Sequence, residues 1–120
     1  MAKGPRLSQE RVAALLDSVR DDLRRLPRVE QRWNDPRRSP LERERDQQAT
    51  FHEWQATMER FELLAGAFLA GNLPPDMVQP FAELVEQLQP LLSTVERLGL
   101  QRPSPALLER LATRLAPSIA

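Results

Sequence analysis

His52 is the only histidine in the chain of 120 residues, so any imidazole chemistry depends on it. Glu53 follows it directly, and Glu59 and Glu62 lie on the same stretch. Zinc-protease helices carry a second histidine one turn after the first, and this stretch has none. A di-iron bundle needs inward glutamates and Glu-x-x-His elements from several helices, which are missing here. We therefore expect a solvated helix face without a bound metal.

Other reactive groups are sparse. Cysteine is absent, which excludes disulfides, thiolate nucleophiles and cysteine-ligated metals. The four glycines are scattered, so no phosphate-binding loop is formed from them. No serine stands with a histidine and an acid in a recognisable order. These patterns predict a protein that is not an enzyme and that holds no cofactor.

An arginine-rich stretch with a central tryptophan is the strongest charged feature: Arg24, Arg25, Arg28, Arg32, Trp33, Arg37 and Arg38. Arginine binds phosphate in a bidentate manner and an exposed tryptophan stacks on bases, so this stretch is a candidate nucleic-acid interface. The alternative is a solvated linker, because acidic residues follow directly at Glu42, Glu44 and Asp46. In that case Trp33 closes one end of a helical bundle. The formal net charge of zero gives no global attraction to nucleic acid or membrane.

Composition favours one soluble α-helical domain. Charged residues make up 28% and hydrophobic residues 41% of the chain, whereas aromatic residues are few. The longest weakly polar run, residues 63–73, is shorter than the ~20 residues that span a bilayer. No apolar leader follows Lys3 and Arg6, so we expect a cytoplasmic protein. Lys3 is the only lysine among 17 basic residues, which favours a GC-rich bacterial genome as the source.

The element that organises the chain is a helix predicted over residues 40–70. Its apolar residues recur at alternating spacings of three and four, which is an a/d seam: Phe51, Trp54, Met58, Phe61, Ala65 and Phe68. Ser39, Pro40 and Glu42 form a capping box at its start, and Gly71 ends it. The seam begins only at Phe51. Residues 41–50 are therefore either a protruding arm or covered by an element outside this core.

Three further helices are predicted around it. The first spans about residues 9–26 and is stopped by Pro27, with a polar connection over 27–39. The second spans about 77–98, with Asp76 and Gln79 as a capping box and a kink at Pro90. The third spans about 105–115 and starts at Ser104-Pro105. Residues 1–7 are expected to be a mobile tail, and residues 8–120 a single domain.

We expect the two long helices, about 40–70 and 77–98, to form an antiparallel hairpin, flanked by helices about 9–26 and 105–115. The fold class is then an all-α four-helix bundle. Gly66 is interpreted as a site of close helix packing, with a ligand contact as the alternative. The short helices cannot easily cover both long ones, so a homodimer is expected. Its packing or oligomer seam is Phe51, Trp54, Met58, Phe61, Phe68, Phe81, Leu84 and Leu88.

These features predict a small non-catalytic helical interaction or adaptor subunit that self-associates and binds an unknown protein partner in a larger bacterial assembly. The alternative is a nucleic-acid-binding accessory protein that uses residues 24–38. Salt separates the two, because phosphate binding weakens steeply as salt rises.

Overall fold

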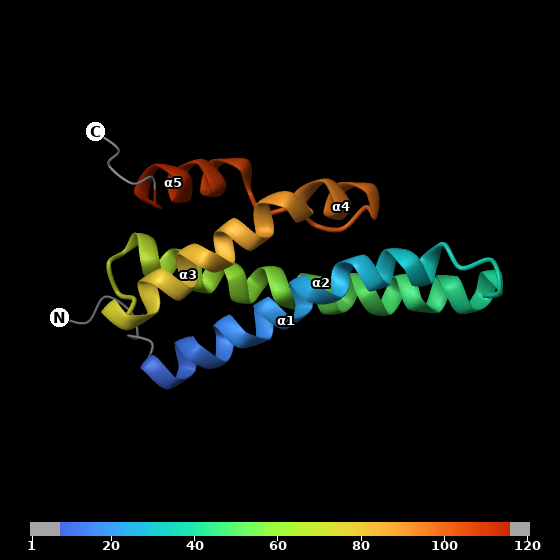
Figure 1. Ribbon diagram of the computed structural model, residues 1–120, viewed down its shortest axis with the longest axis horizontal. Helices are drawn as coiled ribbons and strands as arrows, with labels where there is room; N and C mark the ends of the chain where they lie inside the picture. The colour runs from blue at the N-terminus through green and yellow to red at the C-terminus, as the bar shows by residue number, and fades with distance from the viewer. Residues whose placement is uncertain (1–7, 116–120) are drawn as a thin grey trace.

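The computed structural model describes residues 8–115, and within that range it is built from helices without strands (Figure 1). The α-helices are α1 (Gln9–Trp33), α2 (Pro40–Leu69), α3 (Pro75–Leu88), α4 (Leu92–Arg97) and α5 (Pro105–Leu115), with one 3-10 turn at Gln89–Leu91. The predicted all-α helical bundle is confirmed. The tail predicted over residues 1–7 lies outside the described residues.

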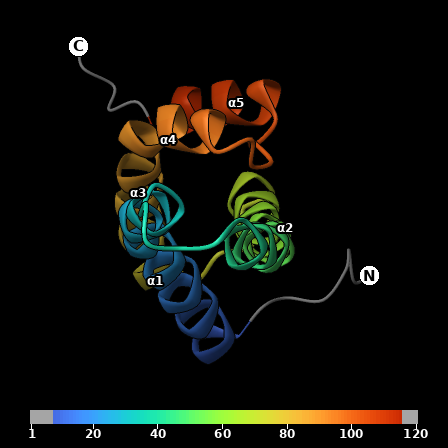
Figure 2. The ribbon, with the colours of Figure 1, turned by 90° about the vertical axis from the view of Figure 1, so that its right-hand side faces the viewer.

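The frame of the bundle is a hairpin of α1 and α2, which run side by side (Figures 1 and 2). Helices α3 and α4 pack on α1, and α5 packs on α2. Helices α2 and α3 meet through aromatic rings: the Phe81 ring centroid lies 6.1 Å from that of Phe61 and 5.3 Å from that of Phe68. These rings hold the two backbones apart, so the closest backbone neighbour of α2 is α1 and not, as the predicted hairpin implies, α3.

Helix α1 continues through Pro27, so the predicted end at residue 26 is wrong. Proline removes the hydrogen bond to the Leu23 carbonyl and costs about 3 kcal/mol in a helix interior. Beyond it, Val29 and Trp33 are each only 8% exposed and extend the buried stripe of α1. Burial of a large apolar side chain contributes roughly 1.5–3 kcal/mol, so these two residues offset the proline. The connection shortens to residues 34–39.

The extension of α1 covers the polar start of α2. Asp46 of α2 is ion-paired with Arg38 of the connection and lies 3.6 Å from Nε of Arg32 on α1. Residues 41–50 are therefore not a free arm. The second of the two predicted alternatives is the correct one, and the covering element is the part of α1 that was predicted to be a loop.

Pro27→Ala is expected to stabilise the protein by about 1–3 kcal/mol, because it restores the backbone donor and removes the ring clash inside α1. Urea denaturation followed by circular dichroism measures this change. Pro40→Ala is the matched control: Pro40 occupies the first turn of α2, where no backbone partner is lost, and no gain is expected. A loss of stability in Pro27→Ala would contradict a continuous α1.

The helix predicted over 77–98 is present with altered details. It runs from Pro75 to Arg97 and is interrupted at Pro90 by the 3-10 turn, where a kink was expected. The predicted Asp76 capping box is wrong: α3 starts at Pro75, and no side chain caps its first turn. The fixed φ of proline suits the first helical position, so a side-chain cap is not required.

Most residues of the predicted seam pack inside the single chain. Six of its residues are buried in the core: Trp54, Met58, Phe61, Phe81, Leu84 and Leu88. Phe68 is partly buried against them. Phe51 is 43% exposed, and its ring packs edge-on against Trp33 with centroids 6.1 Å apart. The seam therefore leaves one large apolar side chain at the surface.

Gly66 is not a close-packing site. Within residues 8–115, a Cβ atom built on it meets nothing within 4 Å, and the residue is exposed on α2. Gly66→Ala is therefore expected to stabilise the protein by about 1 kcal/mol, which is the difference in helix propensity. Gly71→Ala is the control and is expected to destabilise, because Gly71 ends α2 with φ of 75°. Thermal denaturation compares the two, and a destabilising Gly66→Ala would indicate an unseen packing partner.

Candidate functional site

The arginines predicted to bind nucleic acid are mostly paired with aspartates. Arg24 lies 3.9 Å from Asp21 and Arg25 lies 3.6 Å from Asp22, each one turn apart on α1. Arg32 and Arg38 share Asp46, and Arg37 pairs with Asp35. Among residues 8–115, Arg28 is the one member of the predicted set without a carboxylate in ion-pair range. The positive field of the stretch is therefore reduced at most of its positions.

Trp33 lies inside the hairpin end and is only 8% exposed. Its ring packs against Phe51, and its indole nitrogen has no hydrogen-bond partner in the described part of the chain. The candidate nucleic-acid interface needs an exposed tryptophan for base stacking. The structure places this one where it closes the α1–α2 contact, which is the role given to it in the alternative interpretation.

The connection between α1 and α2 is held by Asp35. Its carboxylate accepts hydrogen bonds from the Arg37 side chain at 3.0 and 3.1 Å and from the Arg37 backbone N–H at 2.9 Å. These bonds favour the charged form and lower the pKa of Asp35 from 3.8 to about 2. Because the folded pKa is lowered, the stabilisation is complete above the unfolded pKa and is lost as pH falls through about 2.

Carboxyl-carbon NMR is therefore expected to show Asp35 titrating near 2. In Arg37→Ala the midpoint is expected to rise toward 3.8, and the remaining backbone N–H keeps it below that value. Arg24→Ala removes an arginine from the same stretch that does not contact Asp35, and it is expected to leave the midpoint unchanged. A wild-type midpoint at 3.8 would contradict the hydrogen bonds described.

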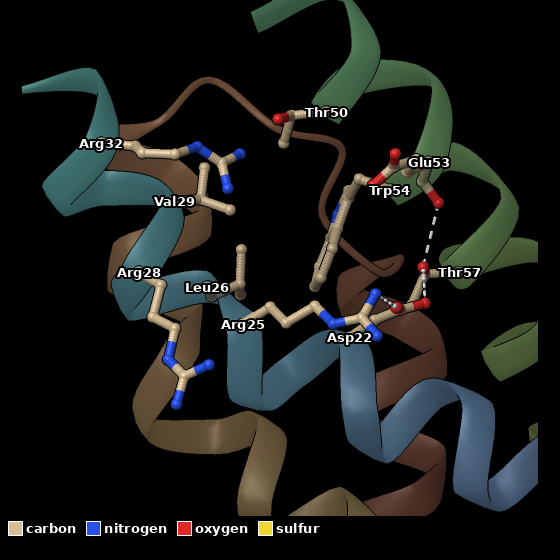
Figure 3. Close-up of a pocket in the computed structure, with 10 residues that line it drawn as sticks. All are labelled: Asp22, Arg25, Leu26, Arg28, Val29, Arg32, Thr50, Glu53, Trp54 and Thr57. Carbon is tan, nitrogen blue, oxygen red and sulfur yellow. Dashed lines mark hydrogen bonds and ion pairs between the residues drawn. The ribbon is translucent and has the colours of Figure 1, made fainter. Parts of the chain in front are cut away.

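An open cleft of about 410 Å³ lies between α1 and α2. Its floor is apolar and nearly covered, formed by Leu26, Val29 and Trp54. The remaining lining residues are polar or charged: Asp22, Arg25, Arg28, Arg32, Thr50, Glu53 and Thr57. Figure 3 shows Trp54 standing between the helices, with Arg32 reaching over Val29 and the Arg28 guanidinium turned away from Trp54. Basic side chains thus line the α1 side of the cleft, and Thr50 and Glu53 line the α2 side.

Hydrogen bonds fix the floor and one end of this cleft. The Trp54 indole N–H donates to the Gln101 carbonyl at 2.7 Å, which ties α2 to the segment before α5. The Thr57 hydroxyl lies 2.6 Å from the Asp22 carboxylate and 2.9 Å from the Glu53 carbonyl (Figure 3). Asp22 also lies 3.8 Å from Arg60. These contacts hold the cleft in shape. At the end formed by Asp22, the negative charge of the carboxylate is offset by Arg25 and Arg60, whereas Arg28 and Arg32 remain exposed.

The residues considered for metal or imidazole chemistry lie elsewhere. His52, Glu53, Glu59 and Glu62 are all exposed on α2. His52 lines a shallow hollow with Gln48, Phe51 and Gln55. Within residues 8–115, no three histidine, cysteine, aspartate or glutamate residues are grouped so that they would hold a metal ion.

The fold and the cleft define an all-α helical bundle with an open cleft beside its longest helices. No family model, curated protein or solved structure matches the chain. None of the helices within residues 8–115 combines the length and apolar character needed to span a membrane. The residues of the cleft and the surface around it are therefore the features that bear on function.

Sequence reasoning did not find the cleft, because it ended the first helix at Pro27. The necessary signal is nevertheless present in the sequence. Arg25, Arg28 and Arg32 are spaced by three and four, in step with the apolar series Leu26, Val29 and Trp33. If one helix carries both series, the apolar residues form a buried stripe and the arginines line the edge of that stripe.

Proposed function

We propose that this protein is a non-catalytic helical interaction module that binds another protein. The observation that carries the proposal is the α1–α2 cleft, which combines an apolar floor with a rim of arginine, threonine and glutamate. Protein interfaces are enriched in arginine and have polar rims. The apolar floor of this cleft is nearly covered, so its arginines supply the accessible contacts. The arrangement suits recognition better than chemistry, because the exposed imidazole of His52 lies outside the cleft.

Nucleic-acid binding through residues 24–38 is the second candidate. The observation in its favour is that Arg25, Arg28 and Arg32 follow one side of α1. Against it, Trp33 is buried, and aspartates on the same helix pair with neighbouring arginines. Phosphate binding gains from uncompensated positive charge, so these pairs favour a protein partner.

The structure gives less support for a homodimer than for binding to a different protein. A homodimer is expected from the sequence because two short helices cannot easily cover two long ones, but most of the predicted seam packs inside one chain. Among residues 8–115, the large apolar side chains that remain exposed are spread along α2 and α3: Leu41, Phe51, Leu63 and Val78. A stable homodimer usually buries a contiguous apolar patch, and these residues do not supply one.

Size-exclusion chromatography with light scattering tests the proposal. Tagged protein, purified without nuclease, is expected to elute free of nucleic-acid absorbance at a multiple of 13.7 kDa. After incubation with nuclease-treated extract of the source cells, it is expected to shift to a larger mass with a second protein in stoichiometric amount. A heterogeneous peak rich in nucleic acid that collapses in high salt would contradict the proposal and favour the arginine stretch.

A further inference from the structure

We propose that the α1–α2 cleft binds an acidic helical segment of the partner protein, through Arg28 and Arg32. This inference rests on the proposed function and names the chemistry of the partner. The observation behind it is that exposed arginines lie beside a covered apolar floor along one side of α1 (Figure 3).

The arginines of the cleft have donors left for a ligand. Arg28 pairs with no carboxylate among residues 8–115 and is exposed. The ion-pair contact of Arg32 with Asp46 is from Nε at 3.6 Å, which is longer than the roughly 2.7–2.9 Å of a tight charge-assisted bond. Its terminal guanidinium nitrogens have no protein partner in the described part of the chain. A guanidinium with free terminal nitrogens accepts a carboxylate in a bidentate manner.

The floor strengthens such an interaction. Leu26, Val29 and Trp54 are each at most 8% exposed, so the surface beneath the arginines is a low-dielectric wall. Charges beside such a wall interact more strongly than charges fully surrounded by water. The floor presents little free apolar area of its own, and we therefore assign recognition to charge and not to insertion of a large apolar side chain.

The spacing of the arginines points to a helical partner. Arg28 and Arg32 lie one turn apart on α1, so their attachment points are separated by roughly 5–6 Å. Carboxylates one turn apart on another helix have the same separation, so both side chains can reach them once the Arg28 guanidinium, which is turned away from Trp54 in Figure 3, rotates toward the cleft. A nucleic acid that continues along the same face would in addition bring its phosphates next to Asp22, which lines the end of the cleft more than one turn before Arg28.

A peptide titration tests this inference. The probe is a fluorescein-labelled, alanine-based helical peptide with glutamates one turn apart, and the same peptide with glutamines is the neutral probe. Fluorescence anisotropy measures affinity for the full chain. Nitrogen-15 NMR locates the binding site through the Trp54 indole N–H and the amide of Thr57. We expect the acidic peptide to shift these signals, and we expect the neutral peptide to leave them unchanged.

Charge-reversal variants separate the cleft from general attraction. Arg28→Glu is expected to weaken acidic-peptide binding by about tenfold or more, because it replaces an attraction with a repulsion. Since Arg28 holds no ion pair within residues 8–115, this variant is expected to keep its fold, and circular dichroism verifies that. Arg45→Glu makes the same change of net charge on an exposed residue of α2 outside the cleft, and it is expected to change the affinity by less than about twofold.

Equal weakening by Arg28→Glu and Arg45→Glu would overturn the inference, and so would signals shifted away from the cleft or absence of binding. Tighter binding of a single-stranded oligonucleotide that displaces the peptide would do so as well, in favour of nucleic acid. If the chromatography yields a stable protein complex while the peptide fails to bind the cleft, the interaction module stands and only the acidic partner is lost. If the complex is also absent, both proposals fail.

Discussion

Phe61→Ala is expected to lower the free energy of unfolding by about 3–5 kcal/mol. Phe61 is fully buried, and its ring packs against that of Phe81 at the meeting of α2 and α3. The substitution removes the transfer free energy of the ring and leaves a cavity in the centre of the bundle. A domain of this size has a total stability of roughly 5–15 kcal/mol, so the variant is expected to be marginally folded.

Phe51→Ala is the matched control for that experiment, because the same substitution is made on the same helix at a position that is 43% exposed. Phe51 keeps one edge-on contact with Trp33, so a loss of about 1 kcal/mol is expected. Urea denaturation of both variants, followed by circular dichroism, gives the two values. Similar losses would contradict the division of the seam into a buried part and an exposed end.

Trp33→Ala is expected to release the end of the α1–α2 hairpin while the rest of the bundle stays folded. Beyond Pro27, α1 contributes two buried apolar residues, Val29 and Trp33. They face the start of α2, where no residue before Thr50 is buried. Removal of a buried tryptophan costs about 3–5 kcal/mol, which is more than the surrounding ion pairs contribute. The loss of stabilising free energy therefore affects mainly the end of the α1–α2 hairpin, where it is expected to cause local unfolding.

Hydrogen exchange measures this local effect residue by residue. Backbone amides over residues 29–48 are expected to lose protection in Trp33→Ala, and the amides around Phe61 are expected to keep it. Leu41→Ala lies on the same hairpin end at a position that is 57% exposed, and it is expected to leave protection unchanged. Unchanged protection in Trp33→Ala would show that the ion pairs of Asp46 are sufficient to hold the hairpin.

Local signals in the sequence predicted the helices well. Ser39, Pro40 and Glu42 form the capping box that was expected, with hydrogen bonds of 3.1 Å in both directions. Gly71 and Gly99 end their helices with positive φ, and the amides that follow them bond back to Ala67 and Val95. These motifs depend on a few neighbouring residues, so they are visible without any knowledge of the fold.

Features that depend on distant residues were not predicted. Pro27 is a strong local stop signal, but Val29 and Trp33 make burial against α2 more favourable than the stop. The a/d seam of 51–68 and the apolar residues of the helix predicted over 77–98 suggest that these two helices are nearest neighbours. The phenylalanines of these helices are large enough to separate the backbones, and α1 occupies the closer position. Packing of this kind is decided by the sizes of facing side chains.

The candidate site was predicted in part. The arginine-rich stretch was recognised, and Arg25, Arg28 and Arg32 do line a cleft. The pairing of Arg24 with Asp21 and of Arg25 with Asp22 follows from their spacing on a helix and was open to prediction. The burial of Trp33 and the sharing of Asp46 by Arg32 and Arg38 require the hairpin, so they could not be found from the stretch alone.

The most direct test of the central claim, that the α1–α2 cleft binds a protein, is quantitative capture from nuclease-treated extract of the source cells. Tagged wild-type chain, Arg28→Glu and Arg45→Glu are compared, and retained proteins are quantified by mass spectrometry. The proposal predicts one protein retained in stoichiometric amount by the wild type and by Arg45→Glu, and reduced about tenfold or more by Arg28→Glu. Retention of the same protein by all three chains, or of no stoichiometric protein by the wild type, would contradict it.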